Sequence, residues 1–128
     1  MLDKVKKRLK ELGYRVKEED MFSLAFCVEK VRNSIQNKIN CSGIPNGLEH
    51  IAIDMSVGEF LLAKKTFSPA DLAGFNLEYA VKQIQAGDTN TQFYNEGSMT
   101  DEQRLNALVT HLLSYGKDEF PAYRRLRW

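Results

Sequence analysis

The chain has 128 residues, 43% of them hydrophobic and 27% charged, and its formal net charge is +1 at pH 7. This length and composition predict a single globular domain, and they argue against a membrane protein because no apolar run approaches the roughly 18 residues that a bilayer span requires. Residues 1–13 mix lysines with carboxylates and lack the apolar centre of a secretory signal, so we expect a soluble, intracellular protein.

The first two predicted elements are amphipathic helices. Leu2, Val5 and Leu9 recur at helical spacing before Gly13, which is typical of a helix stop, so a short helix with a lysine-rich polar face is expected. A second helix is predicted from about residue 20 to residue 40. Its apolar stripe consists of Leu24, Val28, Val31, Ile35 and Ile39.

A third helix is predicted after the loop CSGIPNG. Asn46 followed by Glu49 indicates an N-cap with a reciprocal carboxylate. The segment LEHIAIDMSVGEFLLAKK is apolar around most of its circumference, so we expect neighbours to bury it on more than one side. Gly58 is unfavourable in a helix interior, so we expect either a close helix crossing or tolerated strain at that point.

Two shorter signals follow the third helix. Ser68, Pro69 and Asp71 predict a single short turn of helix. Thr100 and Gln103 form a capping pair for a last helix that ends at Gly116, with an apolar face made of Leu105, Leu108, Val109, Leu112 and Leu113.

The segment between this turn and the last helix does not have a helical pattern. Its polar and apolar residues alternate around Thr89, Thr91 and Phe93, and Gly87 and Asp88 separate two extended runs. We therefore predict a β-hairpin or a long excursion loop over about residues 79–97.

The fold class expected from these elements is mainly α: a small bundle of about four helices, with the hairpin or excursion and an extended C-terminal tail. Residues 1–116 are expected to form the helical domain, and residues 117–128 a docking tail.

The sequence offers little that could support catalysis or metal binding. Cys27 and Cys41 are the only cysteines and have no histidine cluster beside them, so we interpret both as reduced, buried thiols. Asp54 and Glu59 lie about 140° apart on a helix surface, which favours solvent-exposed helix-surface carboxylates or interhelical partners for lysine over a shared acid–base pair. We expect no catalytic residue, no metal and no cofactor, and hence no enzyme.

The C-terminal stretch DEFPAYRRLRW combines the residue types that are enriched at protein interfaces. The candidate contact residues are Phe120, Tyr123, Arg124, Arg125, Arg127 and Trp128. In the alternative interpretation the aromatic rings fold back on the protein's own helices, with Phe120 and Leu126 in the core and the arginines in solvent.

The order of these motifs resembles the head-to-tail connector, or adaptor, proteins of tailed bacteriophages. The resemblance is carried by FCVEKVRNSIQNKINCSGIPNGLEHIAIDMSVGEFLLAKK, by VKQIQAGDTNTQF and by the closing YRRLRW. It implies a structural virion protein that forms a ring, often twelve-fold, beneath the portal protein and extends the DNA channel toward the tail. It places the protein in the virion neck, and in the host cytoplasm during assembly.

The resemblance also implies roles for particular residues. The C-terminal candidates would bind the portal protein. The excursion would face a neighbouring subunit or a tail-side neck or tail terminator protein, or would line the channel. Its candidate residues are Gly87, Asp88, Thr89, Thr91 and Phe93. DNA would pass through the ring without sequence-specific binding.

A small helical nucleic-acid-binding or regulatory module remains as the alternative. Both ends of the chain are basic and the body between them is acidic. The basic segments KVKKRLK and RRLRW would then contact phosphates, and binding would weaken steeply with salt. The acidic body favours the connector, since it would let DNA slide through a channel. A regulatory protein acting as a soluble dimer is a third possibility.

Overall fold

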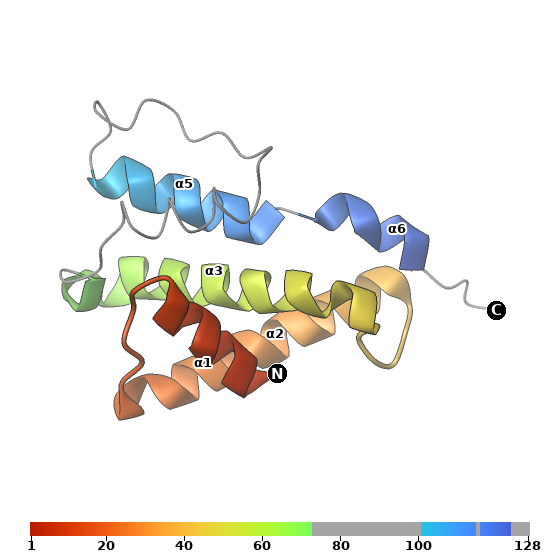
Figure 1. Ribbon diagram of the computed structural model, residues 1–128, viewed down its shortest axis with the longest axis horizontal. Coiled ribbons are helices and arrows are strands. Elements are labelled where there is room, and N and C mark those ends of the chain that lie inside the picture. Colours follow the sequence, from red (N-terminus) through yellow and green to blue (C-terminus); the bar gives the residue numbers. More distant parts are fainter. Residues whose placement is uncertain (73–100, 115, 124–128) are drawn as a thin grey trace.

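The computed structural model describes residues 1–72, 101–114 and 116–123 (Figure 1). The described part of the chain is mainly helical, as expected, and contains no strand. Its α-helices are α1 (Leu2–Glu11), α2 (Met21–Ile39), α3 (Glu49–Phe67), α5 (Asp101–Ser114) and α6 (Phe120–Tyr123). The predicted hairpin or excursion over about residues 79–97 lies outside the described residues.

Short 3-10 turns lead into or follow several of these helices. They span Glu18–Asp20, Asn46–Leu48, Pro69–Leu72 and Lys117–Glu119. The turn at Pro69–Leu72 confirms the short element predicted after the third helix. The four predicted helices of the bundle correspond to α1, α2, α3 and α5.

Helix α1 ends where the sequence predicts. Gly13 has a φ of 97°, a left-handed conformation that favours glycine. The Gly13 N–H donates to the carbonyl of Lys10, and the Tyr14 N–H donates to the carbonyl of Leu9. This pair of hydrogen bonds is a Schellman motif, which satisfies carbonyls that the end of a helix leaves without partners.

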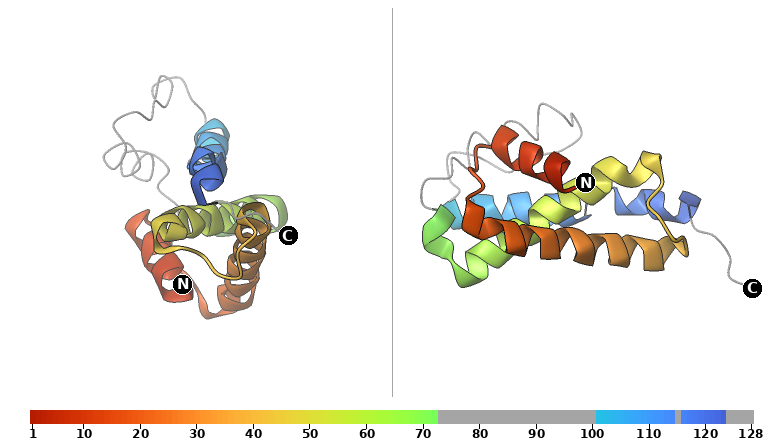
Figure 2. Two further views of the ribbon diagram at one scale, coloured as in Figure 1. Left: turned by 90° about the vertical axis from the view of Figure 1, so that its right-hand side faces the viewer. Right: turned by 90° about the horizontal axis from the view of Figure 1, so that it is seen from below.

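Helix α3 is the centre of the domain. It packs against α1, α2 and α5, and Figures 1 and 2 show α5 on one side of it and α1 and α2 on the other. The expectation that neighbours bury this helix on more than one side is confirmed. Its buried residues are Ile51, Ala52, Met55, Ser56, Val57, Gly58, Phe60 and Leu61.

Gly58 marks a close crossing of α3 and α5, which is the first of the two interpretations of this glycine. A Cβ atom at Gly58 would lie 3.0 Å from Cβ of Leu112 and 3.0 Å from Cγ of Leu113. Because Cβ of Leu112 is fixed to the backbone of α5, the two helices could not approach this closely with a larger residue at position 58. Gly58 therefore lowers the helix propensity of α3 but allows α3 and α5 to pack closely.

The core consists of two clusters along α3. The first joins α1, the first part of α2, the second part of α3, and α5. The second joins the remaining parts of α2 and α3 with Phe120, and its members are Val31, Ile35, Ile39, Leu48, Ile51, Ala52, Met55 and Phe120.

The predicted cap of α3 is wrong. The Asn46–Leu48 turn carries no side-chain capping bond, and α3 begins only at Glu49. The Glu49 carboxylate instead accepts a hydrogen bond from Lys4 of α1 at 2.5 Å, and this contact lowers its pKa. A partner on another helix has replaced the local one.

Candidate interaction surfaces

The structure places Phe120 in the core and not on a surface. Its side chain is 5% exposed and belongs to the second core cluster. The ammonium of Lys38 lies 5.7 Å from the ring centroid, so the ring also has a cationic neighbour on α2. For Phe120, the structure therefore agrees with the alternative interpretation, in which this ring packs in the core, and Phe120 is not among the portal contacts proposed below.

The turn before α6 explains why Phe120 reaches the core. Gly116 has a φ of 85°, and a Cβ atom there would lie 2.7 Å from the Ile51 side chain. The chain can therefore turn closely against α3 before α6 packs on α2. Residues 117–120, expected to begin the tail, are part of the helical domain.

The other predicted contact residues cannot be placed. Gly87, Asp88, Thr89, Thr91, Phe93, Arg124, Arg125, Arg127 and Trp128 lie outside the described residues, as does the side chain of Tyr123. Their roles remain predictions.

Asp54 and Glu59 of α3 pair with cations on two different helices. Asp54 accepts a hydrogen bond from Nε of Arg8 on α1 at 3.1 Å, and Glu59 pairs with Lys30 on α2 at 3.1 Å. Burial raises the pKa of Asp54, although Arg8 and the nearby histidines His111 and His50 oppose this effect. The two carboxylates hold the bundle together and form no acid–base pair.

A buried carboxylate connects the segment before α2 to α3. Asp20 accepts hydrogen bonds from the Tyr14 hydroxyl at 3.0 Å and from the Lys17 backbone N–H at 3.1 Å, and it forms an ion pair with Lys64. Burial raises the pKa of Asp20, but these three partners outweigh it and the net pKa is lowered. Every one of these contacts is internal, so the network has a structural role.

Two phenylalanines of α2 face solvent. Phe22 is 87% exposed and Phe26 is 65% exposed. They lie four residues apart, on the same side of the helix, away from its buried stripe. We call this pair the phenylalanine face. Phe67, at the end of α3, is 83% exposed. It lies at the same end of the domain as the phenylalanine face, since Lys64, one turn earlier on α3, pairs with Asp20 just before α2.

The phenylalanine face is not among the predicted sites, although the sequence contains a signal for it. The stripe through Leu24, Val28 and Val31 fixes the buried side of α2. Phe22 and Phe26 fall outside that stripe, and two large aromatic residues on the polar side of a surface helix indicate an interface.

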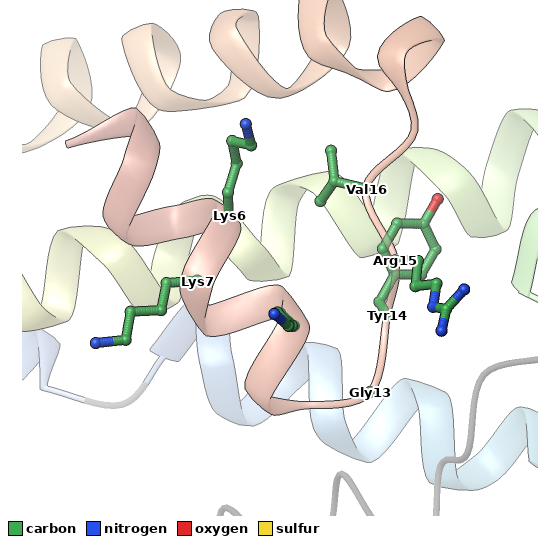
Figure 3. Close-up of a pocket in the computed structure, with 7 residues that line it drawn as sticks. Lys6, Lys7, Gly13, Tyr14, Arg15 and Val16 are labelled. Carbon is green, nitrogen blue, oxygen red and sulfur yellow. The ribbon is translucent and has the colours of Figure 1, made fainter.

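A hollow of about 550 Å³ lies beside the end of α1. It is lined by Lys6, Lys7, Lys10, Gly13, Tyr14, Arg15 and Val16. We call it the basic hollow. Figure 3 shows Lys6 and Lys7 leaving α1 in different directions, with Val16 and Arg15 on the segment that follows the helix. Among the described residues, the four cations that line it form no ion pair or hydrogen bond through their side chains.

A second hollow, of about 450 Å³, lies where α1 meets α3 and differs in charge. There Lys4 pairs with Glu49, and Arg8 pairs with Asp54 and Glu11. Lys4 and Arg8 are thus neutralised within the domain, whereas Lys7, which lines both hollows, and the other cations of the basic hollow have no such partner among the described residues.

The described residues show neither a metal centre nor a membrane span. They contain no group of three or more histidine, cysteine, aspartate or glutamate residues arranged to hold a metal ion. None of the helices they form is both long enough and apolar enough to cross a bilayer. Cys27 and Cys41 are free thiols; Cys27 is buried as expected, but Cys41 is only partly buried.

Comparison with known proteins finds no matching family model, no matching curated protein and no matching solved structure.

Proposed function

We propose that this protein is a head-to-tail connector subunit of a tailed bacteriophage, a structural virion protein that assembles as a ring beneath the portal. The observation that carries the proposal is a small helical domain whose described residues form a packed core and still expose phenylalanines on α2 and α3. A subunit of a cyclic ring must offer two different surfaces to its two neighbours. Exposed aromatic residues on a well-packed domain support such a role.

The packing of α6 supports a second part of the proposal. Phe120 ties the beginning of the C-terminal segment to α2 and α3, so the residues after it start from a fixed point on the domain. The proposed portal contacts are Tyr123, Arg124, Arg125, Arg127 and Trp128, whose residue types suit a buried contact with carboxylates and apolar pockets.

The proposed partners follow from this assignment. They are the portal protein, a tail-side neck or tail terminator protein, and further copies of this chain. DNA would pass through the ring without base-specific contacts, and the protein would lie in the virion neck. We further propose that residues 79–97, with Gly87, Asp88, Thr89, Thr91 and Phe93, face a neighbouring subunit or the tail side.

Co-sedimentation with portal rings from the same source tests the proposal. The full chain should bind, and a chain that ends at Tyr123 should not; this end point keeps Phe120 and thus the core. Arg127→Ala should weaken binding, whereas Lys117→Ala, which also removes one positive charge, should not. Equal binding by all four proteins, or by none, would refute portal docking through the C-terminal residues.

The basic hollow gives specific support to a second candidate, a nucleic-acid-binding module. Cations without internal partners can bind phosphates, and such binding weakens steeply as salt rises. If the full chain failed to bind portal rings but retained duplex DNA in a salt-sensitive manner, and if Lys6→Glu with Lys10→Glu removed that affinity, this second function would replace the first.

A further inference from the structure

We infer that the phenylalanine face of one subunit, together with Glu18 and Glu19, docks into the basic hollow of a second copy of this chain. This inference deepens the proposed connector function and rests on it for the closure of a ring. The contact itself is supported by the composition of the two surfaces.

The first surface combines aromatic and acidic groups. Glu18 and Glu19 lie in the turn just before α2, four and three residues before Phe22, so they border the phenylalanine face. Both carboxylates are exposed, and their side chains have no ion-pair or hydrogen-bond partner among the described residues. This edge of the domain therefore presents apolar rings beside two carboxylates that form no ion pair among the described residues, with Lys17 next to them in sequence.

The second surface, the basic hollow, suits a ligand that carries both apolar and negatively charged groups. Most of the wall of the basic hollow is apolar, since Tyr14, Val16 and the carbon stems of the lysines line it. Its positive groups are Lys6, Lys7, Lys10 and Arg15. A bare phosphate would neutralise the cations but would leave the apolar wall in contact with water. An aromatic side chain flanked by carboxylates satisfies both requirements.

The two surfaces are therefore complementary in charge and in apolar character. They are made by different residues, so the contact joins unlike surfaces and repeats from one copy to the next. When a copy offers its two surfaces to two different neighbours, the contacts close into a ring or continue as a filament, whereas two copies that exchange both contacts form a symmetric dimer. This repetition is the property that a connector subunit requires.

Sedimentation velocity on the full chain tests the inference without a portal protein. The wild-type chain should associate as its concentration rises, and the association should weaken as salt rises, because salt screens the exposed carboxylates and lysines. A chain that stays monomeric up to roughly 1 mM, the range of the weakest specific interfaces, would refute the inference.

Charge reversals identify the two surfaces. The face variant carries Glu18→Lys and Glu19→Lys, and the hollow variant carries Lys6→Glu and Lys10→Glu. Each alone should associate at least roughly tenfold more weakly than the wild type, because like charges then meet at the contact. An equimolar mixture of the two should associate again, since the reversed charges of one variant face those of the other. A mixture that stays monomeric, with both variants folded by circular dichroism, overturns the inference.

Two further variants separate the contact from general charge effects. The control Glu102→Lys with Glu119→Lys makes the same change in net charge on α5 and before α6, outside both surfaces, and should associate like the wild type. Phe22→Ser with Phe26→Ser should weaken association roughly 100-fold, as expected for buried aromatic contacts.

The outcomes also distinguish this inference from the proposed function. If the Phe22 and Phe26 substitutions prevented association while the hollow variant associated normally, the phenylalanine face would have another partner surface and the inference would be wrong. Because portal binding is measured separately with the truncation at Tyr123, the connector function could survive that result.

Discussion

Replacing Phe120 with alanine tests whether the beginning of the C-terminal segment is part of the core. Phe120 is 5% exposed and lies in the cluster with Ile35, Ile51 and Met55. If the ring contributes to this core as the structure indicates, its loss should destabilise the free monomer, with no partner present.

The size of the effect follows from burial. Truncation of a buried phenylalanine to alanine costs about 3–5 kcal/mol, because burial is lost and a cavity remains. Phe120 begins a helix of only four residues, which can shift and partly refill the space, so we place the effect at the lower end of that range. Loss of the cation–π contact with Lys38 adds about 0.5 kcal/mol. We expect a total loss of about 3.5 kcal/mol.

Urea unfolding followed by circular dichroism measures this loss as a lower midpoint at unchanged slope. Phe67→Ala is the matched control: it makes the same substitution at a side chain that is 83% exposed, so it should change the free energy of unfolding by less than about 0.5 kcal/mol. A loss below about 1 kcal/mol for Phe120→Ala, or equal losses for the two variants, would show that Phe120 is not a core residue.

Three further results are expected. Gly58→Ala should lower stability by about 1 kcal/mol in thermal or urea unfolding even though alanine favours helix, because its Cβ would meet Leu112 and Leu113 at 3.0 Å; a more stable variant would show that α3 and α5 can separate freely. The lowered pKa of Asp20 means that its stabilising contribution is complete above the ordinary aspartate pKa and is lost as pH falls toward the lower, folded-state pKa. Wild-type stability should therefore fall below about pH 4 more steeply than that of Asp20→Asn, which should be the less stable protein at pH 7; parallel pH profiles would contradict this assignment. A thiol reagent should modify Cys41 in the folded protein well before Cys27, because Cys27 is buried and burial raises its pKa, with Glu59 adding to the effect; equal rates would contradict that burial.

Much of the helical architecture follows from local sequence patterns. The apolar spacing through Leu24, Val28 and Val31 requires one buried side of α2, and Gly13 supplies the left-handed residue that ends α1. The apolar residues around most of the circumference of α3 predicted burial on several sides, and Gly58 was consistent with either a close crossing or strain. These features could be predicted because each depends on residues within a few turns of one another.

The tertiary structure decided the features that depend on distant partners. Glu49 is at a position suited to a local cap, yet Lys4, 45 residues away, binds its carboxylate. Phe120 resembles an exposed interface residue in sequence, but the turn at Gly116 brings it into the core. The basic hollow could not be inferred from the lysines of α1, because only the packed domain shows that Lys4 and Arg8 are neutralised while Lys6 and Lys10 are not. Sequence patterns specify which side of a helix is buried; which polar groups remain without partners depends on how the helices meet.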